Sequence, residues 1–441
     1  MTPQELGSTR ISSSSPMATD RLDVYIAGRL AGSLERGQRD RLSFVYDDSY
    51  RSDPGATPLS CALPMTAAVH PDDRIRPYLW GLLPDNELVL QRWARQFRVS
   101  ATRPLDLLAQ VGRDLPGAIQ ILTVGEDLAD ASGEVEWLGD DEVAAELRRV
   151  REDEAAWLPP NGRGRWSLAG VHPKVALVFH EGRWGRANGA LATNRILKPA
   201  IAGFADHEIN EHLCLAAATR CGLLAAPSTI ATFGSERAVV VTRFDRFSSP
   251  DGTVERVHQE DLCQALAVSP ANKYQSDRGP SAAQIAALLR SQISGVEGRG
   301  ALWRFFEALV FNWLIAAPDA HAKNYSLLHL GRAVRLAPLY DLASALPYPD
   351  FHGPKVKLGM TVGGHYRVGS IGASTWVREA KVLGLPADGA LARARQLAQA
   401  VPEAFAAARE RLVLEGSSGD FADILVNAVA ANAAACANRL G

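Results

Sequence analysis

Cysteine is scarce in this chain, and its spacing suggests no pairing. The 441 residues hold five cysteines and no CxxC motif: Cys61, Cys214, Cys221, Cys263 and Cys436. Cys214 and Cys221 lie in an apolar stretch of helical character, so we expect free, buried thiols and no disulfide framework. Such usage is typical of a reducing compartment and predicts a cytoplasmic location.

The chain also lacks a long hydrophobic run and an excess of one charge. Its most apolar segment, residues 305–318, contains Glu307 and Asn312 and is shorter than the roughly 20 apolar residues that span a bilayer, so we expect a buried helix and no membrane association. The 47 basic and 49 acidic residues nearly cancel, which gives no global reason to expect nucleic-acid binding. Residues 1–20 are serine-rich without a hydrophobic core and predict a disordered leader.

Zinc-ligand spacing is missing as well. His172, His321 and His365 have no second His or Cys at a spacing such as HxxxH, so no zinc site is predicted. What the chain does have is an ordinary globular composition, 47% hydrophobic and 22% charged. Its length suffices for two or three packed units.

Residues 21–126 predict a small α+β unit. Alternating patterns at 23–26 and 30–34 flank Gly28-Arg29 and indicate a hairpin. Further elements are expected as a strand at 42–46, a helix from about Asp85, a helix at 105–111 and a strand at 118–124.

Residues 127–258 predict a sheet with one long helix. A short polar helix at 142–156 and a mobile Pro/Gly loop at 159–164 come first. The long helix should begin after Asp206, as N-cap, and end before Gly222. Strands are expected at 174–179, 193–198, 228–233 and 238–243.

From residue 259 onward helical patterns dominate. They cover 260–266, 281–292, 302–316, 373–383, 388–399, 402–411 and 420–439. One hairpin is expected among them, with strands at 325–330 and 333–339. Gly331 at the first position of its two-residue turn suits a type II′ turn, and Leu330 then faces Ala333.

A group of polar residues flanks this hairpin. Asp319 and Asn324 stand five residues apart, the spacing of the base and the metal-binding amide in a protein kinase loop. The hairpin register brings Asp341 to roughly 7–8 Å from Asn324, between backbones. Carboxylate and amide oxygens suit Mg²⁺, which takes further ligands from nucleotide phosphate. An alternative stays open, because Asp, His and Asn after a helix also simply turn the chain.

Two lysines stand where phosphate contacts are expected. Gly170 would let the backbone approach a phosphate and Lys174 would supply a charge, although the segment taken alone fits an ordinary loop-to-strand junction better. Lys198 ends an apolar strand and is suited to the α/β-phosphates of a nucleotide or to a solvated surface. Of the acids on the next helix, Glu208 and Glu211, we expect Glu211 to pair with it.

Two charged segments have plain structural explanations. The strand at 239–242 ends in Arg243-Phe244-Asp245-Arg246, which fits a core strand with a solvated tip. Glu260 and Asp261 open a predicted helix, where acids favour the helix dipole.

The order and spacing of these motifs resemble the HipA-type serine/threonine kinases, the toxin halves of bacterial type II toxin–antitoxin pairs. The resemblance runs from about Leu22 to Leu440. It rests on residues 81–85 (GLLPD), 111–114 (VGRD), 167–170 (SLAG) with Lys174, 196–199 (ILKP), 210–211 (NE), 243–246 (RFDR), 259–261 (QED), 319–324 (DAHAKN), 338–341 (PLYD) and 357–360 (KLGM). At Val171-His172 the chain departs from the small residue plus Gln that is common in the family.

The resemblance implies an α+β, two-lobed protein-kinase-like fold. Its N-terminal lobe would be mixed α/β and its C-terminal lobe mainly helical. The implied division is a leader at 1–20, an N-terminal subdomain at 21–126, a small lobe with phosphate loop and hinge at 127–258, and a large lobe with the catalytic loop at 259–441.

The resemblance also implies ATP and Mg²⁺ as cofactors, with roles for single residues. Asp319 corresponds to the catalytic base and Lys198 to the α/β-phosphate lysine. Asn324 and Asp341 correspond to the magnesium ligands. Ser167 corresponds to the serine whose autophosphorylation, in the family, ejects the phosphate loop and silences the enzyme. The remaining nucleotide contacts would be Ala169, Gly170, Val171, His172, Pro173 and Lys174 in the phosphate loop, Thr242, Arg243 and Phe244 in the hinge, and His321, Lys323 and Tyr340 in the pocket wall.

Partners are implied in the same way. Family members bind a small helix-turn-helix antitoxin of the HipB type, and both together bind operator DNA. Family substrates include aminoacyl-tRNA synthetases. Two alternatives remain: a pseudokinase co-repressor that binds the antitoxin without phosphoryl transfer, and a phosphotransferase that acts on small molecules.

Overall fold

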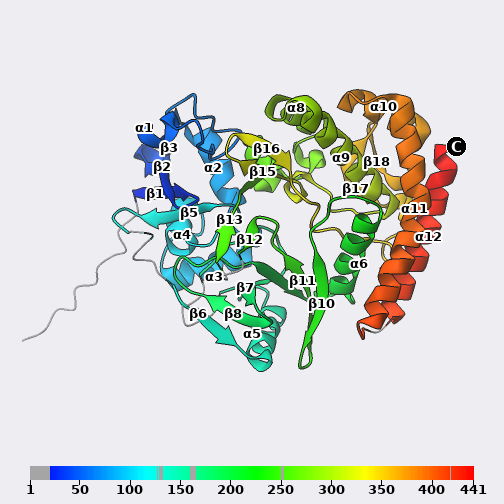
Figure 1. The fold of residues 1–441 in the computed structure, drawn as a ribbon, viewed down its shortest axis with the longest axis horizontal. Coiled ribbons are helices and arrows are strands. Elements are labelled where there is room, and N and C mark those ends of the chain that lie inside the picture. The colour runs from blue at the N-terminus through cyan, green and yellow to red at the C-terminus, as the bar shows by residue number, and fades with distance from the viewer. Residues whose placement is uncertain (1–19, 127, 129–132, 159–164, 250–252, 418) are drawn as a thin grey trace, which may run out of the picture.

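The computed structural model describes residues 20–126, 128, 133–158, 165–249, 253–417 and 419–441. The expected leader, apart from its last residue, and the expected loop at 159–164 lie outside the described residues. Three regions follow one another along the chain: a five-stranded sheet unit, a six-stranded sheet and a mainly helical region (Figure 1).

The N-terminal unit is an antiparallel sheet covered by helices. Its elements are β1 (Arg21–Ile26), β2 (Arg29–Arg36), β3 (Leu42–Tyr46), α1 (Asp48–Ser52), β4 (Val69–His70), α2 (Asp72–Gly81), α3 (Glu87–Phe97), α4 (Pro104–Val111) and β5 (Ile119–Thr123). The strand order is β4-β3-β2-β1-β5. The predicted hairpin β1–β2 is confirmed, but it turns at Ala27-Gly28, one residue early. Both residues have positive φ, 49° and 77°, as a type I′ turn requires.

The second region is a six-stranded antiparallel sheet that carries two helices. Its elements are β6 (Val135–Leu138), α5 (Asp140–Glu152), β7 (Val175–His180), β8 (Arg183–Ala187), β9 (Arg195–Pro199), α6 (His207–Arg220), β10 (Ser228–Phe233) and β11 (Glu236–Thr242), followed by the pair β12 (Arg246–Ser248) and β13 (Val254–Arg256). The strand order is β10-β11-β9-β7-β8-β6. Asp206 precedes α6 as predicted, but it has a left-handed φ of 50°, and its carboxylate pairs with Arg237 and caps nothing.

The third region is mainly helical. Its elements are β14 (His258–Asp261), α7 (Leu262–Ala265), α8 (Ala282–Gln292), α9 (Gly295–Leu314), β15 (Ser326–Leu330), β16 (Ala333–Leu336), β17 (Lys357–Val362), β18 (His365–Arg367), α10 (Ala373–Leu383), α11 (Ala387–Leu414) and α12 (Asp420–Leu440). Helix α6 packs against both α11 and α12, so it joins the six-stranded sheet to this region (Figure 1).

Two predictions in this region need correction. The helix expected at 260–266 is confined to α7, which Asp261 caps by accepting a hydrogen bond from the N–H of Gln264. Residues 258–261 form strand β14 instead, which pairs with β15. The helices expected at 388–399 and 402–411 are one helix, α11, with Pro402 inside it. A proline within a helix costs about 3 kcal/mol. Burial of Val401 and Phe405 and the long contact with α12 offset that cost.

Helix α12 is the one described helix long and apolar enough, by length and composition, to cross a membrane. Its Leu425, Val429 and Ala433 are fully buried in the core that α6, α9 and α11 also build. These contacts explain its apolar composition as that of a core helix.

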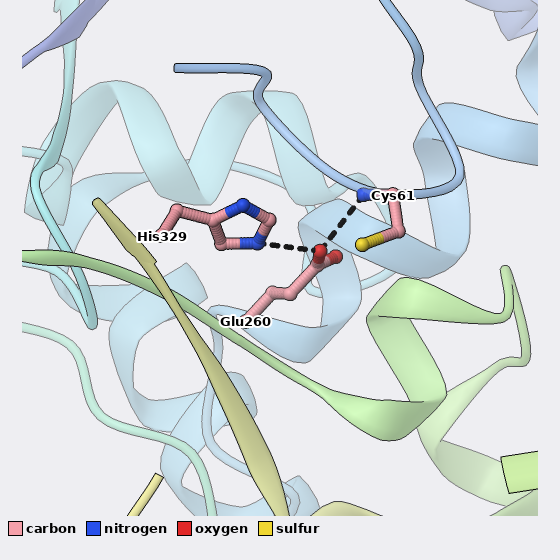
Figure 2. Close-up of side chains that lie close together, drawn as sticks. All are labelled: Cys61, Glu260 and His329. Carbon is pink, nitrogen blue, oxygen red and sulfur yellow. Dashed lines mark hydrogen bonds and ion pairs between the residues drawn. The ribbon is translucent and has the colours of Figure 1, made fainter. Parts of the chain in front are cut away.

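A buried polar joint connects the N-terminal unit to the third region (Figure 2). Glu260 on β14 is fully buried. Its Oε1 accepts a hydrogen bond from the backbone N–H of Cys61 at 2.8 Å and lies 2.9 Å from Nε2 of His329, while Ser60 Oγ donates to Oε2. Burial raises the pKa of Glu260, but His329 and the donors outweigh it and keep the pKa below its usual value. Although the side chains of Cys61, Glu260 and His329 cluster like metal ligands, these hydrogen bonds already satisfy the carboxylate.

A second buried joint connects the N-terminal unit to the six-stranded sheet. Arg243 and Arg246 both bond Asp245, and Arg246 reaches Asp114 at 3.0 Å. Asp245 also accepts a hydrogen bond from the backbone N–H of Gly117 at 2.7 Å. All four charged side chains are at most 6% exposed, so the expected solvated tip is wrong: this segment is a buried charge network.

Candidate active site

A cavity of about 590 Å³ is lined by residues from all three regions. Every residue predicted for the site lies on its wall except Pro173 and Ser167. Tertiary structure therefore brings together side chains that are up to about 170 positions apart in the sequence, from Ala169 to Asp341.

Lys198 is the centre of an ion-pair group on this wall. Its Nζ donates to Glu211 Oε1 at 2.7 Å and also to Asp341 Oδ1, so the predicted pairing with Glu211 is confirmed. Burial alone would lower the pKa of Lys198, but Asp341 and Glu211 raise it above its usual value. For Asp341, burial acts to raise the pKa, and the charges of Lys198 and Lys174 outweigh it and lower the pKa. The lysine and Asp341 are therefore both charged at neutral pH.

The hairpin that returns Asp341 to the site has the predicted register. Leu330 pairs with Ala333, and Gly331 has a φ of 62° while Arg332 has no positive φ, as a type II′ turn requires. The ladder ends at Leu336, and the N–H of Leu339 then donates to Leu224, after α6. Asp341 follows with a φ of 52°. A contact with the second region therefore sets its position, in addition to the hairpin.

Asp319 and Asn324 lie on the loop after α9. The Asn324 side-chain amide donates to the backbone carbonyl of Asp319 at 2.7 Å. Oδ1 of Asn324 accepts no hydrogen bond from the described part of the chain, so this oxygen is available to a cation. The Asp319 side chain is half exposed to the cavity. Its Oδ1 accepts a hydrogen bond from the hydroxyl of Tyr274 and lies 3.5 Å from Nε2 of His321.

His321 is a buried histidine with no hydrogen-bond partner for either ring nitrogen among the described residues. Burial lowers its pKa to about 4, so the ring is neutral at physiological pH. A buried polar group without a partner is costly. Because His321 lines the cavity, a polar ligand there would supply the missing partner.

The segment predicted as a phosphate loop, residues 169–174, is held by one contact before it and one hydrogen bond within it. Trp166 stacks on Trp157, with ring centroids 6.1 Å apart. Gly170 has a φ of 102°, and a Cβ there would meet Lys174 Nζ at 2.6 Å, so only glycine fits. Lys174 Nζ donates to the carbonyl of Ala169 at 2.6 Å. Burial lowers the pKa of Lys174 to about 8.

Ser167 lies outside the cavity and is completely buried. Its Oγ donates to the carbonyl of Leu82 at 2.7 Å, and its backbone N–H donates to Asp114 at 3.0 Å. The hydroxyl is inaccessible in this conformation.

The predicted hinge offers few free backbone donors. The N–H of Thr242 donates to Pro227 at 2.8 Å, and the N–H of Arg243 donates to Asn194 at 3.1 Å. Phe244 is the hinge residue whose N–H makes no hydrogen bond to the described part of the chain. Its ring lies 5.3 Å from that of Tyr340, whose hydroxyl donates to the carbonyl of Lys323 at 2.7 Å.

The cavity wall also holds polar residues that were not predicted from the sequence as site residues, and some of them form ion pairs or hydrogen bonds with predicted ones. The unpredicted residues include Asp85, Asp261, Lys273 and Tyr274. Lys323 Nζ bonds Asp85 at 3.0 Å and lies 3.9 Å from Asp261, and Lys273 Nζ lies 3.5 Å from Asp85. Burial raises the pKa of Asp261 to about 6. Asp85 and Asp261 lie in the motifs at 81–85 and 259–261. The sequence did not indicate that Lys273, 188 positions after Asp85, and Lys323, 62 positions after Asp261, would lie beside them.

The sheets, the helical region and the cavity define an α+β protein of the two-lobed, protein-kinase-like class. Residues 22–122 match the HipA N-terminal domain, and residues 166–405 match the HipA-like C-terminal domain. The chain belongs to the HipA family of toxin kinases.

Individual relatives agree with this assignment. A putative kinase of Sinorhizobium fredii is 33% identical, over 91% of this chain and 94% of its own length. The serine/threonine-protein kinase toxin HipA of Shewanella oneidensis is 28% identical, over 87% of this chain and 88% of its own. HipA in the solved complex of Shewanella oneidensis HipA, HipB and operator DNA superposes with a TM-score of 0.82 at 25% identity, over 95% of this chain and 98% of that one.

Proposed function

We propose that this chain is an ATP- and Mg²⁺-dependent serine/threonine protein kinase that inhibits growth as a toxin. The observation that carries the proposal is the bridge from Lys198 to Glu211 and Asp341 on the wall that also holds Asp319 and Asn324. These are the residue types that phosphoryl transfer requires.

The donor set fits a magnesium nucleotide. Oδ1 of Asn324 and Oδ2 of Asp341 are the oxygens left free by the internal hydrogen bonds, and hard oxygen ligands suit Mg²⁺. Held by these two residues, Mg²⁺ would neutralise negative charge on the nucleotide phosphates. Lys198 would then exchange its bond to Asp341 for the α/β-phosphates, while Glu211 keeps it charged. His321 would gain a hydrogen bond, and the N–H of Phe244 would face the base.

Asp319 is proposed as the base that accepts the proton of the substrate hydroxyl. Its half-exposed carboxylate is within reach of an incoming serine or threonine, and its position beside Asn324 keeps it next to the proposed metal.

Binding of ATP without Mg²⁺ is expected to weaken as the pH rises from 7 to 9. Burial lowers the pKa of Lys174 to about 8, so the lysine loses its charge, and its attraction for phosphate, across this interval. His172 and His207 have pKa values of about 4 and 3 and do not titrate there. Calorimetric titration of ATP at several pH values measures the effect. A Lys174→Met variant should bind more weakly and lose this pH dependence; an unchanged dependence would show that another group causes it.

We further propose that phosphorylation at Ser167 silences the kinase. The buried hydroxyl can receive a phosphate only after the segment has left its place against Leu82 and Asp114. A dianionic phosphate could not return to a pocket that has only a backbone carbonyl for the hydroxyl. The modified segment would therefore no longer position Gly170 and Lys174.

The proposed partners follow from the relatives. The solved Shewanella oneidensis complex contains HipA, HipB and operator DNA, and we propose a HipB-like antitoxin and operator DNA for this chain too. The proposed substrate is a translation component such as an aminoacyl-tRNA synthetase, and the proposed location is the cytoplasm.

Expression of the wild type is expected to arrest growth and to add phosphoserine or phosphothreonine to a cellular protein. Asp319→Ala should do neither, because proton acceptance is lost. Asp350→Ala removes an exposed acid outside the cavity and should behave as wild type. Growth curves and phosphoproteomes of the three strains are compared, and the phosphoproteomes are also searched for phosphate on Ser167 of the chain itself. Toxicity that survives in Asp319→Ala would favour a pseudokinase that acts by binding alone.

A further inference from the structure

Tyr274 stands beside the proposed base, on a segment that the resemblance did not include. Its hydroxyl donates a hydrogen bond to Asp319 Oδ1, and its ring packs edge-on against His321, with centroids 4.7 Å apart and an angle of 82°. Both the tyrosine and Asp319 line the cavity.

The backbone around Tyr274 is fixed. The carbonyl of Tyr274 accepts hydrogen bonds from the N–H groups of Asp277 and Gly279, at 3.0 and 2.9 Å. The next residue, Gln275, accepts from the N–H of Thr361 on β17 at 2.8 Å and donates from Nε2 to Thr361 Oγ1 at 3.1 Å. The phenol therefore approaches Asp319 from a rigid support.

The phenol acts only as a donor to this carboxylate. Burial, and then the charge of Asp319, raise the pKa of Tyr274 above its usual value, so its proton stays in place at physiological pH. The hydrogen bond occupies one oxygen of Asp319. The other oxygen, Oδ2, has no hydrogen-bond partner among the described residues.

We propose that Tyr274 is a positioning residue for phosphoryl transfer, which holds the Asp319 carboxylate by one oxygen so that the other receives the proton of the substrate hydroxyl. The inference rests on the proposed kinase function. A carboxylate on a half-exposed loop can rotate about two bonds, and a fixed hydrogen bond to a charged group restricts it. Such positioning accelerates a reaction without contributing to substrate binding.

The test is Tyr274→Phe, which removes the hydroxyl and keeps the ring against His321. The full chain is incubated with Mg²⁺, radiolabelled ATP and a degenerate library of serine- and threonine-containing peptides. We expect kcat to fall roughly ten- to a hundredfold, the effect of losing a hydrogen bond to a charged group, with KM for ATP and for peptide unchanged. Tyr366→Phe, on β18 outside the cavity, is the matched control and should retain wild-type kcat.

A double-mutant comparison separates positioning from a merely structural role. In an Asp319→Ala background, with the residual in vitro transfer of radiolabelled phosphate followed over long incubations, Tyr274→Phe should cause no further loss, because its effect passes through the carboxylate. An equal further loss would overturn the inference, and so would a Tyr274→Phe enzyme with wild-type or higher kcat, which would mean that the phenol does nothing or blocks the substrate. If the wild type itself transfers no phosphate, the proposed function fails, and this outcome is distinct from an active enzyme that is indifferent to Tyr274.

Discussion

An Asp341→Asn variant is expected to lose the Mg²⁺-dependent part of ATP binding and to turn over roughly a hundred- to a thousandfold more slowly. Asparagine keeps the shape of the side chain and removes its charge. The proposed metal then loses its only carboxylate among the two protein ligands, and Lys198 keeps only Glu211 as its anionic partner.

Calorimetry with ATP, with and without Mg²⁺, measures this prediction directly. In the wild type the metal should strengthen binding, whereas in Asp341→Asn the two titrations should coincide. Asp350→Asn, an exposed acid outside the cavity, is the matched control. Metal-dependent binding that persists in Asp341→Asn would place the cation elsewhere.

Asp245→Ala is expected to destabilise the fold by about 3–5 kcal/mol, the usual cost of breaking a buried ion pair. The substitution leaves Arg243 and Arg246 without the carboxylate that both share, and the N–H of Gly117 without its acceptor. Burial acts to raise the pKa of Asp245, but the two arginines outweigh it and lower the pKa well below its usual range, so the aspartate is charged throughout the physiological range.

Urea unfolding followed by tryptophan fluorescence gives the loss of stability. Asp53→Ala is the comparison, because Asp53 pairs with Arg29 at the surface, where ion pairs contribute little; its unfolding curve should match the wild type. Equal curves for Asp245→Ala and the wild type would contradict the buried charge network.

Local patterns predicted most of the long helices, several strands and the hairpin register, but they did not indicate strands β8 and β17. Gly331 fixed the turn that pairs Leu330 with Ala333, and the Lys198–Glu211 pair was expected from an apolar strand followed by a helix with acids on it. These features depend on neighbours in sequence or on one crossover. The division at residues 127 and 259 stays a prediction, as do the roles of the site residues.

Features that depend on distant partners were not predictable in this way. Glu260 matches the first turn of a helix, but its hydrogen bonds to Ser60 and Cys61, some two hundred residues earlier, favour a strand and burial. The charges of Arg243 and Asp245 suggest solvent until Asp114 and Gly117 are known to pack on them. Tyr274 carries no local signal at all, because its partner Asp319 lies on a separate loop.

The two buried joints have a consequence for how a ligand can enter and leave. The N-terminal unit is bonded to the segment after the six-stranded sheet at Asp245 and to the helical region at Glu260. It therefore restrains both parts that line the cavity. A large rotation of one part against the other would separate the buried charged groups at Asp245 and Glu260 from their partners, which is energetically costly. Exchange of a bound molecule should therefore depend on local movement of residues 170–174, where Val171 is already exposed, once the bond from Lys174 to the Ala169 carbonyl has opened.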